Sequence, residues 1–210
     1  MNFSKKNHEH QKGNSLIVNQ KSIIYFTLGI LVMSTVAFNK VENKITKNTN
    51  VKAYLEVLSN SKAYTLQIAE AMPAEKYTYK PTDSVRSFGE QMAHIATSSK
   101  FLIALFVKGE PMPSQEDFAA AAKMEKEMGV SKEACLKAIS ESYNLVISTF
   151  QNMSDEQLAE TFVVPFDPQQ PAFAKEKAFQ FIGEHTAHHR GQALVSLRMQ
   201  GIKSPEYKLY

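Results

Sequence analysis

The stretch from Phe173 to Gln200, FAKEKAFQFIGEHTAHHRGQALVSLRMQ, decides the fold of this chain. It reads as one long helix that ends at Gly201, a residue type common at helix C-termini. Side chains four positions apart on a helix stand one above the other, so His185 and His189 face the same way. The stretch therefore predicts a long helix that can offer two imidazoles to one metal ion.

Two more polar residues of this helix have expected places. His188 lies about 100° round the helix from His189, so we expect it to face solvent or to support a neighbour through a hydrogen bond. Gln192 continues the face of the His185/His189 pair. We expect it to line the site and to hold water or a polar group of a substrate, while an exposed helix glutamine is the competing interpretation.

Three further helices are predicted upstream, each from apolar residues at helical spacing. The first spans Val51–Met72. The second runs from a capping box, Ser87 with Glu90, to Gly109. The third is capped by Ser131. Because no convincing set of strands accompanies these helices, we predict an all-α fold, a four-helix bundle.

The connections between the helices also carry signals. The connection between helices two and three is long, and residues 116–128 within it are rich in Ala, Glu, Lys and Met, so a short helix is expected there. Ser154 with Gln157 starts another helical turn. Residues 161–171, TFVVPFDPQQP, read as extended and broken by prolines, too isolated to found a sheet.

The N-terminal part of the chain divides into a basic polar tail (1–21), an apolar segment (22–38) and a polar linker (39–50), before the bundle domain (51–210). The apolar segment reads SIIYFTLGILVMSTVAF. Its most hydrophobic part is shorter than the roughly 20 residues of a spanning helix, and small residues follow at a spacing that suits cleavage. We therefore expect a signal peptide or a membrane anchor. A buried core helix is the competing interpretation.

That segment gives the expected location of the protein. The chain would be exported, to the periplasm or elsewhere outside the cytoplasm, or anchored in a membrane by residues 22–38 alone.

The charge and cysteine content of the chain limit the classes of partner and of cross-link that we expect. A net charge of only +3 over 210 residues, without a basic stripe, argues against nucleic acid. The single cysteine, Cys135, excludes an intrachain disulfide framework, and a homodimer is left open.

His94 is the one histidine outside the N-terminal tail and the last helix. It lies between Met92 and Ile95 in an apolar part of helix two, where a buried imidazole needs a polar partner. It is either a third metal ligand or a core histidine bonded to a carbonyl or carboxylate. Three neutral imidazoles would leave coordination positions open, as in catalytic metal sites, and Zn²⁺, Ni²⁺, Fe²⁺ or Mn²⁺ could accept them.

Four other residues have weaker signals. Glu90 lies one turn before His94, but its capping role competes with a role at a metal. Glu184 is expected to point away from the histidine pair. Gly191, inside a helix, suggests a close approach of a neighbouring helix. Cys135 is expected to be a small buried residue rather than a nucleophile.

Two segments carry a family resemblance. MPAEKYTYKPTDSVRSFGEQMAHIA (Met72–Ala96) and HTAHHRGQALVSLRMQGIKSPEY (His185–Tyr207) resemble the two signature regions of the DinB-like superfamily, which includes the YfiT-like metal-dependent hydrolases. The resemblance implies a four-helix bundle and a divalent metal held by His94, His185 and His189. The segment His189–Gln192 and Arg198 also match the pattern, which adds weight to Gln192 as a residue that lines the site.

The functional hypotheses follow from that resemblance. The first is a metal-dependent hydrolase or thiol S-transferase acting on a small molecule, although an export segment departs from the cytosolic relatives that use thiols. The alternative is a non-catalytic metal-binding or stress-related module at the cell envelope. An ion at the floor of an open pocket favours the enzyme, and a sealed site favours the module. A bundle without metal predicts that His94 lies far from the pair.

Overall fold

The structure, a computed structural model, describes residues 51–208. The predicted signal or anchor segment, 22–38, lies outside the described residues, so export and anchoring stay predictions. None of the helices within residues 51–208 combines the length and apolar composition needed to cross a membrane. The described residues, 51–208, form one compact unit.

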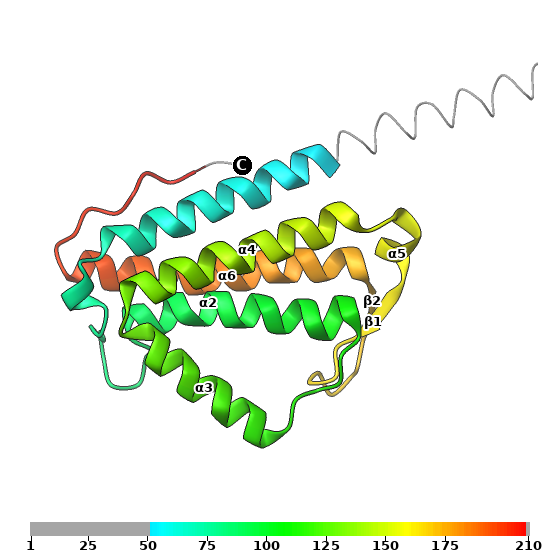
Figure 1. The fold of residues 1–210 in the computed structure, drawn as a ribbon, viewed down its shortest axis with the longest axis horizontal. Helices are drawn as coiled ribbons and strands as arrows, with labels where there is room; N and C mark the ends of the chain where they lie inside the picture. The colour runs from blue at the N-terminus through cyan, green and yellow to red at the C-terminus, as the bar shows by residue number, and fades with distance from the viewer. Residues whose placement is uncertain (1–50, 209–210) are drawn as a thin grey trace, which may run out of the picture. The chain divides into compact units, whose positions relative to one another are not determined.

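Four long helices make up the bundle (Figure 1): the helix over residues 51–71, α2 (Phe88–Leu102), α4 (Lys132–Asn152) and α6 (Lys175–Met199). The helix α2 packs against both α4 and α6. The helix over residues 51–71 also contacts α4 and α6. Its Ser61 hydroxyl bonds the Tyr143 hydroxyl of α4 at 2.8 Å and accepts a hydrogen bond from Arg190 Nη1 of α6 at 2.7 Å. The prediction of a four-helix bundle is confirmed for this part of the chain, which is mostly helical.

The predicted helix starts are also confirmed. Ser87 and Glu90 form a reciprocal capping box at the start of α2, and Ser131 accepts from the Ala134 amide at the start of α4. A 3₁₀ turn, η1 (Ala74–Lys76), precedes α2, and a π-helical segment, η2 (Ile103–Lys108), continues it. The chain leaves η2 at Gly109, whose φ of 73° is in the left-handed region that favours glycine.

The long connection holds a regular helix, α3 (Gln115–Gly129), which lies obliquely against α2 (Figure 1). Its C-terminal end touches the start of α2 at a contact between two glycines. A Cβ atom on Gly89 would meet the Gly129 carbonyl oxygen at 1.7 Å, so only a residue without a side chain fits there. This contact fixes the position of α3, and with it the side chain of Glu125, one turn before Gly129.

The prediction for residues 161–171 is wrong in one respect. A short helix, α5 (Asp155–Ala159), begins at the expected Ser154/Gln157 capping box, and two short strands follow, β1 (Thr161–Val163) and β2 (Ala172–Ala174). The strands pair antiparallel with Phe162 opposite Phe173. The physical reason is packing: Phe162 is buried and stacks on Phe106 at 4.4 Å between ring centroids, which stabilises a hairpin that would be marginal alone.

The apolar core has two parts. One cluster joins residues 64–96 to α4 and the end of α6, and includes Ile68, Met92 and Ile139. The other surrounds η2 and the hairpin, and includes Phe106 and Phe179. The histidines of α2 and α6 lie along the bundle between these two clusters, in a region where polar groups need partners.

Candidate metal centre

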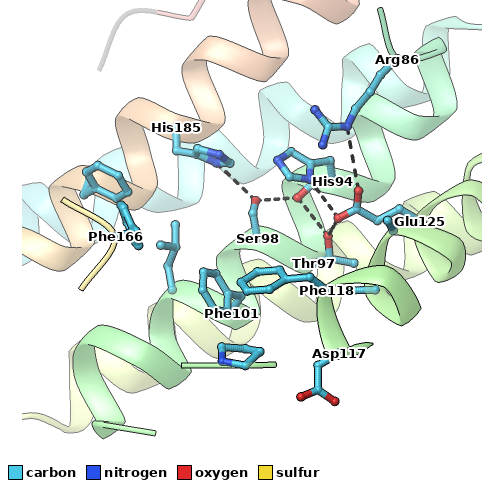
Figure 2. Close-up of a pocket in the computed structure, with 15 residues that line it drawn as sticks. Arg86, His94, Thr97, Ser98, Phe101, Asp117, Phe118, Glu125, Phe166 and His185 are labelled. Carbon is cyan, nitrogen blue, oxygen red and sulfur yellow. Dashed lines mark hydrogen bonds and ion pairs between the residues drawn. The ribbon is translucent and has the colours of Figure 1, made fainter. Parts of the chain in front are cut away.

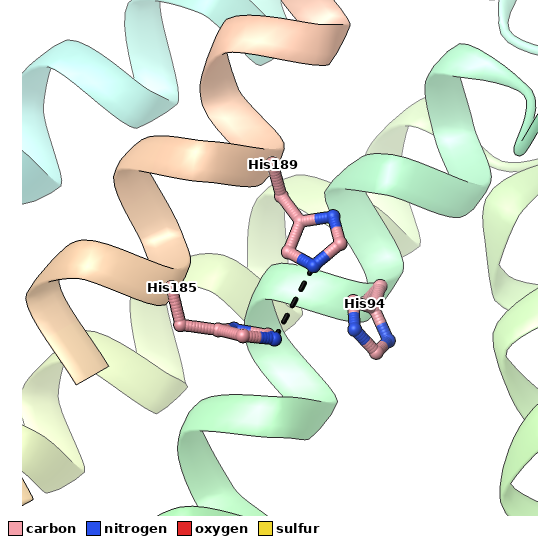
Figure 3. Close-up of side chains that lie close together, drawn as sticks. All are labelled: His94, His185 and His189. Atoms are coloured by element: carbon pink, nitrogen blue, oxygen red, sulfur yellow. Dashed lines mark hydrogen bonds between the residues drawn. The ribbon is translucent and has the colours of Figure 1, made fainter. Parts of the chain in front are cut away.

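The structure brings together the three predicted histidines. His94 comes from α2, and His185 and His189 come from successive turns of α6; Figure 3 shows the rings converging. One nitrogen from each ring lies within 4.8 Å of those of the other two. The ring centroids of His94 and His189 are 4.4 Å apart. The hypothesis of a bundle with His94 far from the pair is therefore wrong.

Each ring has a hydrogen-bond partner on Nδ1. His94 Nδ1 lies 2.9 Å from Glu125 Oε1, and His189 Nδ1 lies 2.8 Å from Gln91 Oε1. His185 Nδ1 lies 3.3 Å from the Ser98 hydroxyl oxygen, whose own proton goes to the His94 carbonyl. These partners are acceptors, so each Nδ1 carries the proton and each Nε2 carries a free lone pair.

Those lone pairs fit a cation. His185 Nε2 and His189 Nε2 lie 3.2 Å apart, close to the separation of two ligands on one ion at about 2.0–2.1 Å. Two lone pairs that face each other at this distance repel, and a cation between them removes the repulsion. The chemistry of this donor set therefore fits a divalent ion that accepts imidazole nitrogen.

The environment keeps the pair on α6 in the neutral form that a metal needs. Burial, followed by the proximity of His94, lowers the pKa of His185 to about 4 and that of His189 to about 3. Both groups are therefore neutral at physiological pH. Metal ligands must be unprotonated, so little proton release is needed before these two rings bind an ion.

Glu125 of α3 is the acidic partner of the site. It accepts hydrogen bonds from His94 and from the Thr97 hydroxyl, and Arg86 Nε lies 3.9 Å from its second oxygen. Burial raises the pKa of this carboxyl, but the hydrogen bonds from His94 and Thr97 outweigh burial and hold the pKa below its ordinary value. Glu125 is thus ionised at neutral pH and orients His94, an arrangement common behind metal-bound histidines.

A second set of hydrogen bonds leads from His189 to the surface. The buried Gln91 accepts from His189 and donates to Gln192 Oε1 at 2.5 Å, and Gln192 Nε2 lies 2.7 Å from His188 Nε2. The two glutamine amides can satisfy all of these hydrogen bonds in a single orientation. Gln91 therefore fixes the ring of His189, and Gln192 fixes Gln91.

A cavity of about 460 Å³ opens beside the histidines (Figure 2). One side of it is polar and is formed by Arg86, His94, Thr97, Ser98, Glu125 and His185. The other side is apolar, with Phe101, Phe118, Phe166 and Phe181. His189 is only 5% exposed and does not line this cavity, so an ion would sit between a closed side at His189 and an open side at the cavity.

The comparisons with known proteins identify the family and the fold. A family model described as the DinB superfamily matches residues 58–193. The chain belongs to the DinB superfamily. The resemblance predicted from residues 72–96 and 185–207 is thereby confirmed, and no curated protein matches the sequence.

Solved structures show the same fold as this DinB-superfamily chain. A DinB-like protein from Bacillus cereus is 14% identical, with a TM-score of 0.59, over 75% of this chain and 97% of that one. YfiT from Bacillus subtilis, described as a probable metal-dependent hydrolase with an unusual four-helix bundle topology, is 18% identical, with a TM-score of 0.58, over 73% of this chain and 89% of YfiT. At these identities the similarity concerns the fold alone.

Other predicted residues of the DinB-superfamily chain have different roles from those expected. Gln192 reaches the histidines through Gln91 and is bonded to His188, so it does not line the cavity. Gly191 has open space around its Cα, so no helix approaches it closely; the close approach occurs at Gly89 instead. A glycine within a helix therefore does not by itself predict that a neighbouring helix approaches at that position.

The predictions for four further residues agree with the structure. His188 is exposed and bonded to Gln192, Glu90 caps α2, and Glu184 is exposed. Cys135 is buried, and burial raises the pKa of its thiol to about 12, so it is no nucleophile at neutral pH.

Sequence reasoning missed the residues that support the histidines, Glu125, Gln91 and Ser98, and it missed Arg86 at the cavity. A signal for Glu125 existed in the pattern of α3, because Phe118, Ala121, Ala122 and Glu125 follow helical spacing and place this one carboxylate on the apolar face. Gln91 lies on α2 three residues before His94, in an otherwise apolar segment. The residue is 2% exposed, and a buried amide of this kind needs partners.

Proposed function

We propose that this chain is a metal-dependent hydrolase that acts on a small molecule bound in the cavity beside His94 and His185. The observation that carries the proposal is the position of the three-histidine set at the polar end of a 460 Å³ cavity. Cavities of this size suit small-molecule substrates. The likeness to YfiT, itself described as a probable metal-dependent hydrolase, supports the same class.

His94, His185 and His189 would hold the ion through their Nε2 atoms, and Zn²⁺, Ni²⁺, Fe²⁺ and Mn²⁺ are the candidates. Such an ion supplies Lewis acidity, which polarises a substrate carbonyl and brings the pKa of water down to about 7. Within residues 51–208, no fourth His, Cys, Asp or Glu joins this group of ligands. Three protein ligands leave room for an exogenous one, as catalytic sites require.

The other residues of the site position the ligands and the substrate. Glu125, Ser98 and Gln91 each hold one imidazole in the orientation that points its Nε2 toward the common centre. Arg86 lines the cavity near His94, where its guanidinium can bind an anionic oxygen. The phenylalanines opposite exclude water from the substrate, which strengthens these interactions.

Two other functions remain as alternatives. A thiol S-transferase would use the same open position for the sulfur of a thiol, and it would need a second substrate. A non-catalytic metal-binding module would need no cavity next to the ligands, and the cavity lined by His94 and His185 argues against it. Export or anchoring by residues 22–38 remains part of the proposal and places the reaction outside the cytoplasm or at a membrane.

The test is a turnover screen with the full chain loaded with each candidate metal. Carboxylic esters, amides and thiol-plus-electrophile pairs are offered to wild type, to His189→Ala and to His188→Ala as the matched control on the same helix. We expect hydrolysis by wild type and His188→Ala, with a loss of at least 100-fold in His189→Ala. Transfer to the thiol without hydrolysis would favour the S-transferase, and silence across all substrates would contradict catalysis.

A further inference from the structure

The four phenylalanines at the cavity come from four different parts of the chain. Phe101 lies on α2, Phe118 on α3, Phe166 between β1 and β2, and Phe181 on α6. Figure 2 shows Phe101, Phe118 and Phe166 opposite the polar side chains. Separate elements thus deliver aromatic rings to one place, next to the candidate metal centre.

Three of these rings are unusually exposed for aromatic side chains. Phe118 is 43% exposed, Phe166 is 50% exposed and Phe181 is 38% exposed. Scattered apolar residues on a surface need no explanation, but exposed rings that converge on one cavity mark a binding site. The rings of Phe101 and Phe118 meet edge to face at 5.9 Å, an arrangement that aromatic rings favour and that a further aryl ring can extend.

The polar side of the cavity has one cationic side chain, Arg86, that can bind an anionic ligand. Arg86 contacts Glu125 only at 3.9 Å, and within residues 51–208 its guanidinium has no hydrogen bond at normal distance. The charge of Glu125 is engaged by His94 and Thr97. Asp117, at the cavity edge, is bonded to the backbone amide and hydroxyl of Ser114, and Figure 2 shows its carboxylate pointing away from the cavity.

We infer that the cavity takes arylalkanoic acid derivatives, with the aryl ring between the phenylalanines and the acyl oxygens between Arg86 and the histidines. This inference rests on the proposed function, since it names the substrate class of the same site. Hydrolysis breaks the acyl C–O bond of an ester, places the oxygen of water on the acyl carbon and delivers one proton of that water to the leaving alcohol, while the other passes to solvent as the acid ionises. The product retained in the cavity is an arylalkanoate, whose carboxylate Arg86 can bind through two donors.

The experiment is calorimetric titration of 3-phenylpropanoate into the full chain, with and without Zn²⁺. Propanoate lacks the ring, and 3-cyclohexylpropanoate has a ring without aromatic faces. We expect 3-phenylpropanoate to bind about 30-fold more tightly than propanoate because a ring is buried, and about 3-fold more tightly than the cyclohexyl compound. Equal binding of 3-phenylpropanoate and propanoate would overturn the inference, and so would tighter binding of the cyclohexyl compound.

Two variants and one control variant locate the ligand. Phe118→Ala should weaken 3-phenylpropanoate about 10-fold and leave propanoate unchanged, while Met124→Ala, at a residue of similar exposure on the same helix, should change neither. Arg86→Met should weaken both compounds by similar factors. Equal effects of Phe118→Ala and Met124→Ala would contradict the proposed position of the ring.

Failure of this inference is distinguishable from failure of the proposed function. Binding of 3-phenylpropanoate that depends on Phe118 and Arg86, measured also without metal, supports the cavity assignment even where no ester is hydrolysed. Hydrolysis of aliphatic esters with no gain from an aryl group would support the hydrolase and overturn the inference.

Discussion

The helices α6 and α3 build opposite sides of the same site by different means. The helix α6 supplies His185 and His189 through its own period, since the two residues lie one turn apart. The helix α3 supplies no ligand. It supports His94 through Glu125, and the close contact of Gly129 with Gly89 lets α3 approach α2.

This difference shows which parts of a site are encoded locally. The spacing of the histidines on the α6 side needs only that a helix forms, so substitutions at exposed positions of α6 outside the histidines should be tolerated. The α3 side depends on a close contact between two backbones, and a single methyl group at that contact separates Glu125 from His94. The glycines of the two sides provide a direct comparison, because Gly89 is in contact with Gly129 and Gly191 is in open space.

The largest expected effect comes from Gly89→Ala. Its Cβ would lie 1.7 Å from the Gly129 carbonyl oxygen, so α3 must move or the chain must unfold. We expect a loss of about 3 kcal/mol in the free energy of unfolding, measured by urea denaturation. Gly191→Ala is the matched control and should be stabilising by about 0.5–1 kcal/mol, because alanine favours a helix and nothing lies within 4 Å. Similar changes in both variants would remove the distinction between the two sides.

Glu125→Ala tests the support of His94 without moving α3. His94 would lose the acceptor on its Nδ1, and loss of such a partner typically lowers metal affinity 10- to 100-fold, by about 1.4–2.7 kcal/mol. Glu127→Ala, on the exposed side of the same helix, should leave the Kd for Zn²⁺ unchanged. Equal Kd values for the two variants, measured by chelator competition, would show that Glu125 has no role in the site.

The last prediction concerns acid. Burial lowers the pKa of His185 to about 4 and of His189 to about 3, below the value of about 6.5 in an unfolded chain. The unfolded state therefore binds more protons, and the stability of metal-free protein is highest above pH 6.5 and falls as the pH drops toward 4. In EDTA, the urea midpoint of wild type should decrease between pH 7 and pH 5. A double variant, His185→Asn with His189→Asn, should show a smaller decrease.

Much of the fold could be predicted because its signals are local. The caps at Ser87, Ser131 and Ser154 and the spacing of His185 and His189 act within a few residues, and each agrees with the structure. The family resemblance added His94, whose neighbours alone left its role open.

The errors arose where distant residues decide the structure. The hairpin forms because Phe162 stacks on Phe106, which lies more than 50 residues away. Gln192 bonds to Gln91 rather than facing the cavity, although its helical position matched the histidine face. The roles of Gly89 and Glu125 depend on how α3 packs on α2, and no local pattern specifies that packing.

The most direct test of the account is the affinity of the full chain for Zn²⁺, measured by calorimetric or chelator competition for wild type, His189→Ala and His188→Ala. His188 neighbours His189 on α6 but is exposed and bonded to Gln192. We predict one tight ion per chain for wild type and His188→Ala, and at least 100-fold weaker binding for His189→Ala, whose circular dichroism should stay helical. Equal affinities in all three proteins would contradict the three-histidine centre.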